Sequence, residues 1–247
     1  GIYLESIGEK AFAYCSGLQW VYLPESLKTI EAESFAYCAE LTAIYIPKTV
    51  TVIRNRILQD SPKAVIFGVS GSAAETYAKE NGIPIALDLN LRPTAWESVE
   101  AARATVEKIF EQIDILKIND EEMRFLLQRD VDPATAGEAL LERYPALRVL
   151  LLTCGGKGTY LFGRDVGTIY VEPHRVKVVD TTGAGDSYMG AFLYACESCG
   201  GNVERLEEMG RYAAAAAELT IGARGAIQAM PEKERLDAYC KQQGIPV

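Results

Sequence analysis

The chain has 247 residues, of which 49% are hydrophobic and 24% charged, a composition typical of a globular protein. Its formal net charge of −9 and the lack of a basic stripe argue against a nucleic-acid-binding protein. No apolar run approaches the roughly 20 residues of a membrane span, so we expect neither nucleic acid nor membrane among its partners. The first residue, Gly1, falls inside a sequence repeat, and we therefore expect a piece of a longer chain.

Residues 1–85 contain an internal repeat with an offset of 23 residues. The segment Ile7–Cys15 matches Ile30–Cys38, and the offset persists as far as Leu27 and Val50. Each unit offers a short apolar strand whose side chains must stack on the next unit. One phenylalanine and one cysteine of each unit are expected to fill the interior, namely Phe12, Phe35, Cys15 and Cys38.

This repeat resembles the BspA-type leucine-rich repeats of bacterial surface proteins, and residues 61–85 resemble the way in which such arrays often end. The resemblance implies a small solenoid associated with adhesion and protein contacts and not with catalysis. Two or three turns can equally form only a scaffold or a cap, and both interpretations stay open.

Residues 86–247 show alternating strand and helix patterns, which are typical of an α/β fold with a parallel sheet. The expected strands are residues 83–89, 115–118, 147–153, 159–162, 168–171 and 176–179. The expected helices are residues 96–113, 119–128 and 134–143, with three further helical stretches after residue 183. Ligand sites in such folds lie at the carboxyl ends of the strands.

Polar residues follow the first of these strands. Asp88, Asn90 and Arg92 form a D-x-N-x-R pattern at its carboxyl end. Arg92 could hold phosphate oxygens through its fork of N–H donors, or it could be a surface arginine that precedes a proline.

Two further patterns follow the next strands. Asn119 and Glu122 form N-x-x-E, which by itself is a capping box with Asn119 as N-cap. Thr153, Gly155 and Gly158 form T-x-G-x-x-G between two strands, where a tight hairpin would explain the glycines.

The most informative stretch is D-T-T-G-A-G-D, residues 180–186. A glycine turn here leads directly into a helical run, and free N–H groups at a helix N-terminus attract anions. Gly183 and Gly185 allow the backbone to form an anion-binding concavity. Asp186 places a carboxylate where an anion should bind, which suits a base that takes a proton beside a transferred phosphate. A glycine turn followed by a capping aspartate is the structural alternative.

Taken in this order, the four motifs resemble those of the ribokinase-like (PfkB) carbohydrate kinases, and the residues around them are most similar to those of fructokinases. The resemblance implies a ribokinase-like (Rossmann-like) fold and transfer of the γ-phosphoryl group of ATP to a sugar hydroxyl. Asp186 would be the base, and the backbone amides of Gly183, Ala184 and Gly185 would stabilise charge on the phosphate. Arg92 would steady the phosphate oxygens.

The same resemblance implies ATP and Mg²⁺ as cofactors. Asn119 and Glu122 would hold hydrated magnesium, with Glu122 acting through water. The implied nucleotide-binding residues are Asn119, Thr153, Gly155, Gly158, Gly225 and Ala226. Asp88 and Asn90 would lie near the sugar substrate. No Walker motif is present, which excludes a P-loop kinase.

The resemblance covers only about the C-terminal half of the kinase domain, and the repeat occupies the place of the other half. We therefore expect two domains, residues 1–85 and 86–247, with an incomplete sheet. An open strand edge favours a protein partner or a homo-oligomer that covers it. The residues that would identify the sugar are absent, and positioning supplies much of the catalytic rate. The alternative function is a leucine-rich-repeat interaction module joined to an inactive or truncated kinase remnant.

The six cysteines give little evidence of chemistry. Cys196 and Cys199 form a single C-x-x-C pair, whereas structural zinc sites need four ligands. The chain has one histidine, His174, which leaves no credible Ser-His-Asp set. Reduced thiols in a cytoplasmic setting fit this pattern best.

Overall fold

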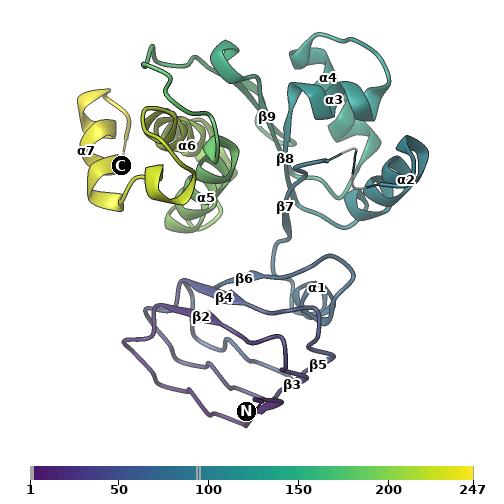
Figure 1. Ribbon diagram of the computed structural model, residues 1–247, viewed down its shortest axis with the longest axis vertical. Helices are drawn as coiled ribbons and strands as arrows, with labels where there is room; N and C mark the ends of the chain where they lie inside the picture. Colours follow the sequence, from purple (N-terminus) through teal and green to yellow (C-terminus); the bar gives the residue numbers. More distant parts are fainter. Residues whose placement is uncertain (1–2, 93, 95, 247) are drawn as a thin grey trace. The chain divides into compact units, whose positions relative to one another are not determined.

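The computed structural model describes residues 3–92, 94 and 96–246 of the chain (Figure 1). The chain divides into an N-terminal unit, Gly1–Ile85, and a C-terminal unit, Ala86–Val247. Within the described residues, no helix combines the length and the apolar character that a membrane crossing requires. All six cysteines are free thiols.

The N-terminal unit holds two three-stranded parallel sheets, to which successive repeats each contribute a strand. One sheet contains β1 (Ser6–Ile7), β3 (Thr29–Ile30) and β5 (Val52–Ile53), and the other contains β2 (Trp20–Tyr22), β4 (Ala43–Tyr45) and β6 (Val65–Phe67). Ser6 pairs with Thr29, and Thr29 pairs with Val52, so the register has the 23-residue offset of the sequence. The β4–β6 pair departs from it, because Ala43 pairs with Val65.

The interior of this unit matches the prediction only in part. Phe35 and Cys38 are fully buried, and the Cys38 thiol donates to the Phe12 carbonyl at 3.1 Å. The prediction is wrong for Phe12, which is 41% exposed, whereas Cys15 is half-buried and packs against this core. Phe12 stacks on Phe35 with ring centroids 5.2 Å apart. It belongs to the first described turn, so a neighbouring turn covers only one side of its ring.

Helix α1 (Ala73–Glu80) covers the last turn of this array. Tyr77 is buried, and its hydroxyl accepts a hydrogen bond from the backbone N–H of Ile57 at 3.1 Å. Gly68 leaves room for the helix, because a Cβ at this position would lie 2.9 Å from the Cβ of Ala74. The stack therefore ends on a helix instead of a further strand.

The C-terminal unit is built on a five-stranded sheet with the order β11-β10-β9-β8-β7. Its strands are β7 (Ala86–Asp88), β8 (Ile115–Asn119), β9 (Val149–Thr153), β10 (Thr159–Gly163) and β11 (Gly167–Val171). Strands β7, β8 and β9 are parallel, whereas β10 and β11 join them antiparallel. The predicted α/β organisation is confirmed, with a sheet that is parallel in three of its strands.

The strand predicted at residues 176–179 is not formed. Val178 and Val179 are 58% and 45% exposed, so their apolar character does not reflect burial in a sheet. The N–H groups of Val179 and Asp180 instead donate to the carbonyl of Ile221, at the end of helix α6 (Leu206–Ile221). The apolar run is therefore a connecting segment held against a helix end.

Helices cover both faces of this sheet, as Figure 1 shows. One side carries α2 (Val99–Phe110), α3 (Asp120–Leu127) and α4 (Pro133–Arg143), and the other carries α5 (Ala184–Ser198), α6 (Leu206–Ile221) and α7 (Lys233–Gln242). Short 3-10 turns occur at η2 (Gly155–Lys157), η3 (Val203–Arg205) and η4 (Ile227–Ala229). Alternate strand residues such as Ile115 and Leu151 share a core with Phe192 and Ala213. Glycines permit close packing, as at Gly137, where a Cβ would overlap the Phe162 ring.

Strand β7 forms one edge of the sheet. Within the described residues it pairs only with β8, so its other side has no strand partner. The strand predicted over residues 83–89 has three residues in the structure. Just beyond it, the N–H of Leu89 donates one further hydrogen bond to the carbonyl of Lys117 in β8.

Candidate functional site

The predicted site residues begin at the carboxyl ends of the three parallel strands. Asp88 ends β7, Asn119 ends β8 and Thr153 ends β9. Asp88 lies opposite Lys117, and Asn119 lies opposite Thr153, so these residues form neighbouring positions along one edge of the sheet. This edge is where an α/β fold places its ligands.

The turn before α5 lies beside this edge. Gly183 is the N-cap residue, with a φ of +80° that favours glycine. The N–H of Ala184 bonds to the Thr181 carbonyl at 3.3 Å, and the carbonyl of Gly183 accepts from Ser187 at 2.9 Å. The first-turn N–H groups have no acceptor within the helix and, together with the helix dipole, favour an anion.

Both glycines of the turn have close neighbours from elsewhere in the chain. A Cβ on Gly183 would lie 3.0 Å from the Cβ of Ala226, and a Cβ on Gly185 would lie 2.9 Å from the Nζ of Lys117. The turn therefore meets both strand β8 and the loop that follows α6. This geometry brings together three of the segments predicted to form the site.

Asp180 fixes the loop after α6 to the turn. Its Oδ2 accepts from the N–H of Gly225 at 3.0 Å, while its Oδ1 accepts from the N–H and the hydroxyl of Thr182 at 3.0 and 2.7 Å. These hydrogen bonds, from Thr182 first and then Gly225, lower the pKa of Asp180 to about 2. Asp180 is absent from the predicted site residues. As the first residue of the D-T-T-G-A-G-D motif, it could have been recognised from the sequence as part of the site.

Asp186 lies in the first turn of α5 and is exposed. Its carboxylate forms no hydrogen bond or ion pair with any other described residue. An accessible carboxylate beside free helix N–H groups is able to take a proton from a hydroxyl held near a bound anion. Its position is thus compatible with the predicted base.

Lys117 is a buried cation of this site that sequence reasoning missed. Its Nζ donates to the Oδ2 of Asp88 at 2.7 Å. The available signal was a single lysine within the apolar strand Ile-Leu-Lys-Ile-Asn. Asp88, predicted to lie near the sugar, is paired with this lysine, and its place near a sugar stays a prediction.

Asn119 and Glu122 form the capping box, as one interpretation of their spacing predicted. The side-chain oxygen of Asn119 accepts from the N–H groups of Glu121 and Glu122 at 3.0 and 2.9 Å. Glu122 is buried, and its two oxygens accept from the N–H groups of Asn119 at 2.8 Å and Leu91 at 2.6 Å. The carboxylate therefore also holds the loop after β7.

The predicted magnesium role of this pair is restricted by the surrounding geometry. The described residues contain no group of three or more His, Cys, Asp or Glu side chains that could hold a metal ion. Each Glu122 oxygen retains a lone pair beside its backbone hydrogen bond. Magnesium usually keeps several waters and binds one or two carboxylates plus substrate phosphates, so a water-mediated role is the one that these residues fit.

Asn90 and Arg92 do not approach the α5 turn among the described contacts. Asn90 is exposed with a φ of +42°. Arg92 is also exposed, and its Nη1 lies 3.5 Å from the carbonyl oxygens of Asn90 and Leu91. The surface-arginine interpretation describes Arg92 in this structure, because its fork of donors faces its own loop.

The T-x-G-x-x-G turn is a tight connection between antiparallel strands β9 and β10. Its glycines are required by the backbone, with φ values of +55° at Gly155 and +85° at Gly158. The N–H of Cys154 donates to the Gly158 carbonyl at 2.8 Å. A Cβ on Gly158 would lie 2.5 Å from the Val171 carbonyl oxygen, so the hairpin alone explains this glycine.

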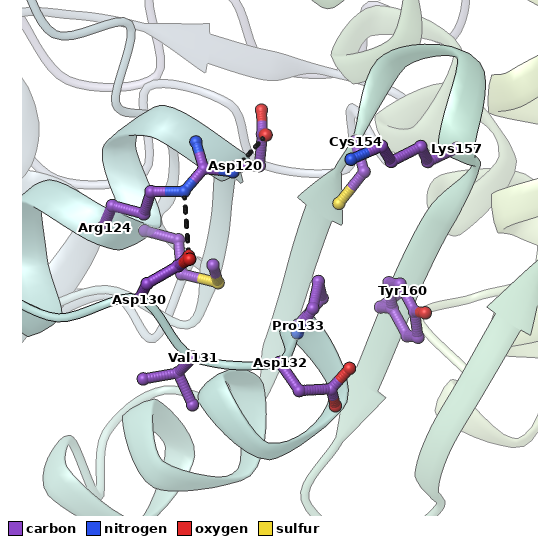
Figure 2. Close-up of a pocket in the computed structure, with 10 residues that line it drawn as sticks. Asp120, Arg124, Asp130, Val131, Asp132, Pro133, Cys154, Lys157 and Tyr160 are labelled. Carbon is purple, nitrogen blue, oxygen red and sulfur yellow. Dashed lines mark hydrogen bonds and ion pairs between the residues drawn. The ribbon is translucent and has the colours of Figure 1, made fainter.

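A pocket of the described residues lies elsewhere, beside α3 and the η2 turn, with a volume of about 420 Å³ (Figure 2). Its lining residues are Asp120, Met123, Arg124, Asp130, Val131, Asp132, Pro133, Cys154, Lys157 and Tyr160. Figure 2 shows Arg124 between Asp120 and Asp130, with N–O distances of 3.0 and 3.3 Å. None of the predicted site residues lines this pocket.

Comparison with known proteins identifies the family. The model of the pfkB family carbohydrate kinases matches residues 5–233. A relative from Arabidopsis thaliana with a fructokinase name is 37% identical over 174 residues, which cover 69% of this chain and 81% of that protein. Fructokinase-2 from Solanum habrochaites is 36% identical over 163 residues, covering 64% of this chain and 48% of that protein. The chain spans between 42% and 52% of the length of this and six other fructokinase relatives.

Solved structures are similar as well. A Vibrio cholerae fructokinase double mutant, bound to fructose, ADP and potassium, has a TM-score of 0.61 and 27% identity over 68% of this chain and 53% of that chain. A ribokinase II from E. coli in complex with ATP and Mg²⁺ has a TM-score of 0.58 and 22% identity, over 82% of this chain and 59% of that chain, and shows likeness of fold. The family match, the sequence relatives and the fold agree, and the chain belongs to the pfkB family of carbohydrate kinases.

Proposed function

We propose that this chain carries the phosphoryl-transfer centre of an ATP-dependent sugar kinase of the fructokinase type. The observation that carries the proposal is the turn before α5, where free helix N–H groups and the exposed carboxylate of Asp186 lie side by side. The turn is an anion site, and Asp186 is the base beside it.

In this proposal, Asp186 accepts the proton of the attacking sugar hydroxyl. The backbone amides of the Gly183–Asp186 turn stabilise the negative charge of the transferred phosphoryl group. Because the donors are part of the backbone, they are oriented before the substrate arrives. Phosphoryl transfer depends mainly on such positioning and charge stabilisation.

The nucleotide would extend from this turn along the carboxyl edge of the sheet. Thr153, Gly155 and Gly158 would border its ribose and phosphates, while Gly225 and Ala226 would border the base. Support comes from Asp180, which ties the Gly225 loop to the turn, and from an E. coli neighbour solved with ATP and Mg²⁺. Magnesium, when bound, would neutralise phosphate charge, held through water by Asn119 and Glu122.

The sugar and its binding groups are part of the proposal too. Fructose is the first candidate, because the sequence relatives are named fructokinases and the Vibrio cholerae neighbour binds fructose. This chain spans about half the length of most of these relatives. The proposal includes a protein partner or a second copy of the chain that supplies further groups to the sugar site. Strand β7, which has an unpaired side among the described residues, is the proposed place of contact.

The proposal is tested with the full chain in a coupled ADP-release assay with fructose, other hexoses and ribose. Asp186→Asn should lower turnover by about 10²–10⁴-fold, the contribution typical of a general base. It should leave MgATP affinity largely unchanged, as measured by calorimetry. Asp165→Asn, at an exposed carboxylate between β10 and β11, is the matched control. Equal turnover in the wild type and the Asp186 variant would remove Asp186 from the mechanism.

For residues 1–85 we propose a BspA-type leucine-rich-repeat solenoid with a role in protein contacts. Support comes from the parallel sheets, whose first strand pairs are 23 residues apart. A rise in melting temperature with MgATP would support a working nucleotide site in the same chain, because a ligand that binds only the folded state stabilises it. No rise at millimolar nucleotide would leave protein contact as the remaining role.

A further inference from the structure

Two thiols lie together at the carboxyl end of helix α5. Cys196 belongs to the last turn of the helix, and Cys199 is its C-cap residue, three positions later. Residues three apart on a helix share one face, with Cβ atoms about 5–6 Å apart. Both cysteines are free and half-buried, whereas Cys154 and Cys240, the other cysteines of the C-terminal unit, are buried. The partly accessible thiols of this unit are thus the two that neighbour each other.

The backbone that follows the pair forms a glycine turn. Gly200 and Gly201 have φ values of +62° and +70°, and the N–H of Gly201 donates to the carbonyl of Cys196 at 2.8 Å. A Cβ on either glycine would have no neighbour within 4 Å, so no side-chain packing confines this turn. Helix ends also fray more readily than helix interiors. The end of α5 can therefore adjust around the two thiols.

A disulfide between these cysteines requires only a small adjustment. Disulfide-bonded residues have Cα atoms about 4.4–6.8 Å apart and Cβ atoms about 3.5–4.5 Å apart. Cα atoms three positions apart on a helix are already about 5 Å apart, so the Cβ atoms must approach by roughly 1–2 Å. Because Cys199 is the C-cap residue, the last turn can tighten while the body of α5 stays in place. Strain of this kind makes a disulfide easier to reduce, so the bond is expected to be reversible.

The surroundings distinguish the two thiols. Burial, followed by the neighbouring Cys199 thiol, raises the pKa of Cys196, which disfavours its thiolate. The guanidinium of Arg205, in the η3 turn, interacts electrostatically with Cys199. Since the thiolate is the nucleophile and a nearby arginine stabilises it, Cys199 is the thiol expected to react first. Cys196 would then react with the product.

We propose that Cys196 and Cys199 form a reversible dithiol–disulfide pair that exchanges with low-molecular-weight disulfides such as glutathione disulfide. The Cys199 thiolate attacks one sulfur of the reagent, which breaks the S–S bond, forms a mixed disulfide and releases one glutathione thiolate. The Cys196 thiolate then attacks the Cys199 sulfur, forms the bond within the protein and releases the second glutathione thiolate. The protein thiols are oxidised by two electrons, the glutathione disulfide is reduced, and the released thiolates take up the two protons.

The test places the reduced full chain in glutathione buffers of increasing oxidation. Acid quenching, intact mass and peptide mapping then identify the products. The wild type should lose two hydrogen atoms from the peptide that contains both cysteines, and dithiothreitol should restore them. Cys196→Ser should stop with one glutathione bound at Cys199, because the second step is removed. Cys199→Ser should form no disulfide within the protein and should bind glutathione more slowly.

Two further comparisons examine the site itself. Arg205→Gln removes the positive charge beside Cys199 and should slow the uptake of glutathione in the Cys196→Ser background. Arg211→Gln is the matched control, because Arg211 is paired with Glu207 on the protein surface as Arg205 is with Glu208. It should leave the rate unchanged. Cys15→Ser, which removes a half-buried thiol of the N-terminal unit, should leave disulfide formation unchanged.

The outcomes decide the proposal without reference to nucleotide binding. A wild-type protein whose two thiols stay reduced in every buffer would overturn it, as would a disulfide that forms only in urea. Equal glutathione uptake by Cys199→Ser and Cys196→Ser would overturn the assigned order of attack. Circular dichroism checks that the variants are folded, and if a serine variant is not, the peptide map of the wild type and the rate of disulfide formation in Arg205→Gln decide instead. The proposed kinase function stands or falls separately, in its own assay.

Discussion

The contact between Gly185 and Lys117 can be tested through stability alone. In Gly185→Ala, the new Cβ would lie 2.9 Å from Nζ and 3.7 Å from Cε of Lys117. The first distance is too short for a stable contact, whereas the second is ordinary van der Waals contact. The ammonium must therefore move, and its hydrogen bond to Asp88 is strained or lost.

Two opposing terms set the size of the effect. Alanine is favoured over glycine in a helix by up to about 1 kcal/mol, and a hydrogen bond to a charged group contributes about 1.5–3 kcal/mol. The Lys117 and Asp88 side chains are 7% and 19% exposed, so solvent screens this pair only weakly. The expected net result is a destabilisation of about 1–2 kcal/mol, or a fall in melting temperature of roughly 2–8 °C.

Urea unfolding followed by tryptophan fluorescence measures this change. The chain has two tryptophans, and Trp20→Phe, at a position 70% exposed, leaves Trp96 to report on the C-terminal unit. Gly190→Ala on the same helix is the control, because a Cβ there would have no neighbour within 4 Å. It should stabilise the unit by about 0.5–1 kcal/mol.

The same substitution in a Lys117→Met protein shows whether the penalty comes from the lysine. The side chain of Lys117→Met ends near the position of Cε, so Gly185→Ala should become neutral or stabilising there. The reasoning is refuted if Gly185→Ala stabilises the wild-type background as much as Gly190→Ala does. It is equally refuted if the penalty persists in the methionine background.

Two other predictions concern the loops around the site. The pKa of Asp180 is lowered to about 2 from the usual 3.8, so its carboxylate stabilises the fold above about pH 4, and this stabilisation is lost as the pH falls toward 2. Between pH 5 and 2, the urea midpoint of Asp180→Asn should therefore fall less than that of the wild type. Parallel plots of midpoint against pH for the two proteins would contradict this. Gly158→Ala should destabilise the C-terminal unit by about 2–4 kcal/mol, because its Cβ would lie 2.5 Å from a backbone oxygen at a φ of +85°. Thermal melting checks the latter, with Gly156→Ala, where no atom lies within 4 Å, as the tolerant control.

The sequence predicted those features of the site that depend on local pattern. The turn at Gly183, the capping box at Asn119 and the hairpin at Gly158 each lie within a few residues of the signal that predicted them. The apolar run at residues 176–179 misled the strand prediction, because exposed valines in a connecting segment look like a buried strand.

Contacts between distant segments could not be predicted in this way. Lys117 contacts Gly185 only because β8 packs against the start of α5. No local sequence pattern predicts this contact. The hydrogen bond between Glu122 and the backbone of Leu91 likewise joins two loops that follow neighbouring strands. The side chain of Arg92, which the sequence predicted at the phosphate, contacts the backbone carbonyls of Asn90 and Leu91 in its own loop.

The shortness of β7 bears on the proposed contact with another chain, at the side of this strand that is unpaired among the described residues. The strand has three residues, and its last one, Asp88, is held by Lys117 of the neighbouring strand. Short edges with charged residues resist the indefinite addition of strands that leads to aggregation. A chain docking here would form few backbone hydrogen bonds, so its affinity would come mainly from side chains that pack on the flanking helices. Selectivity for one matched surface, instead of for any extended peptide, is the expected result.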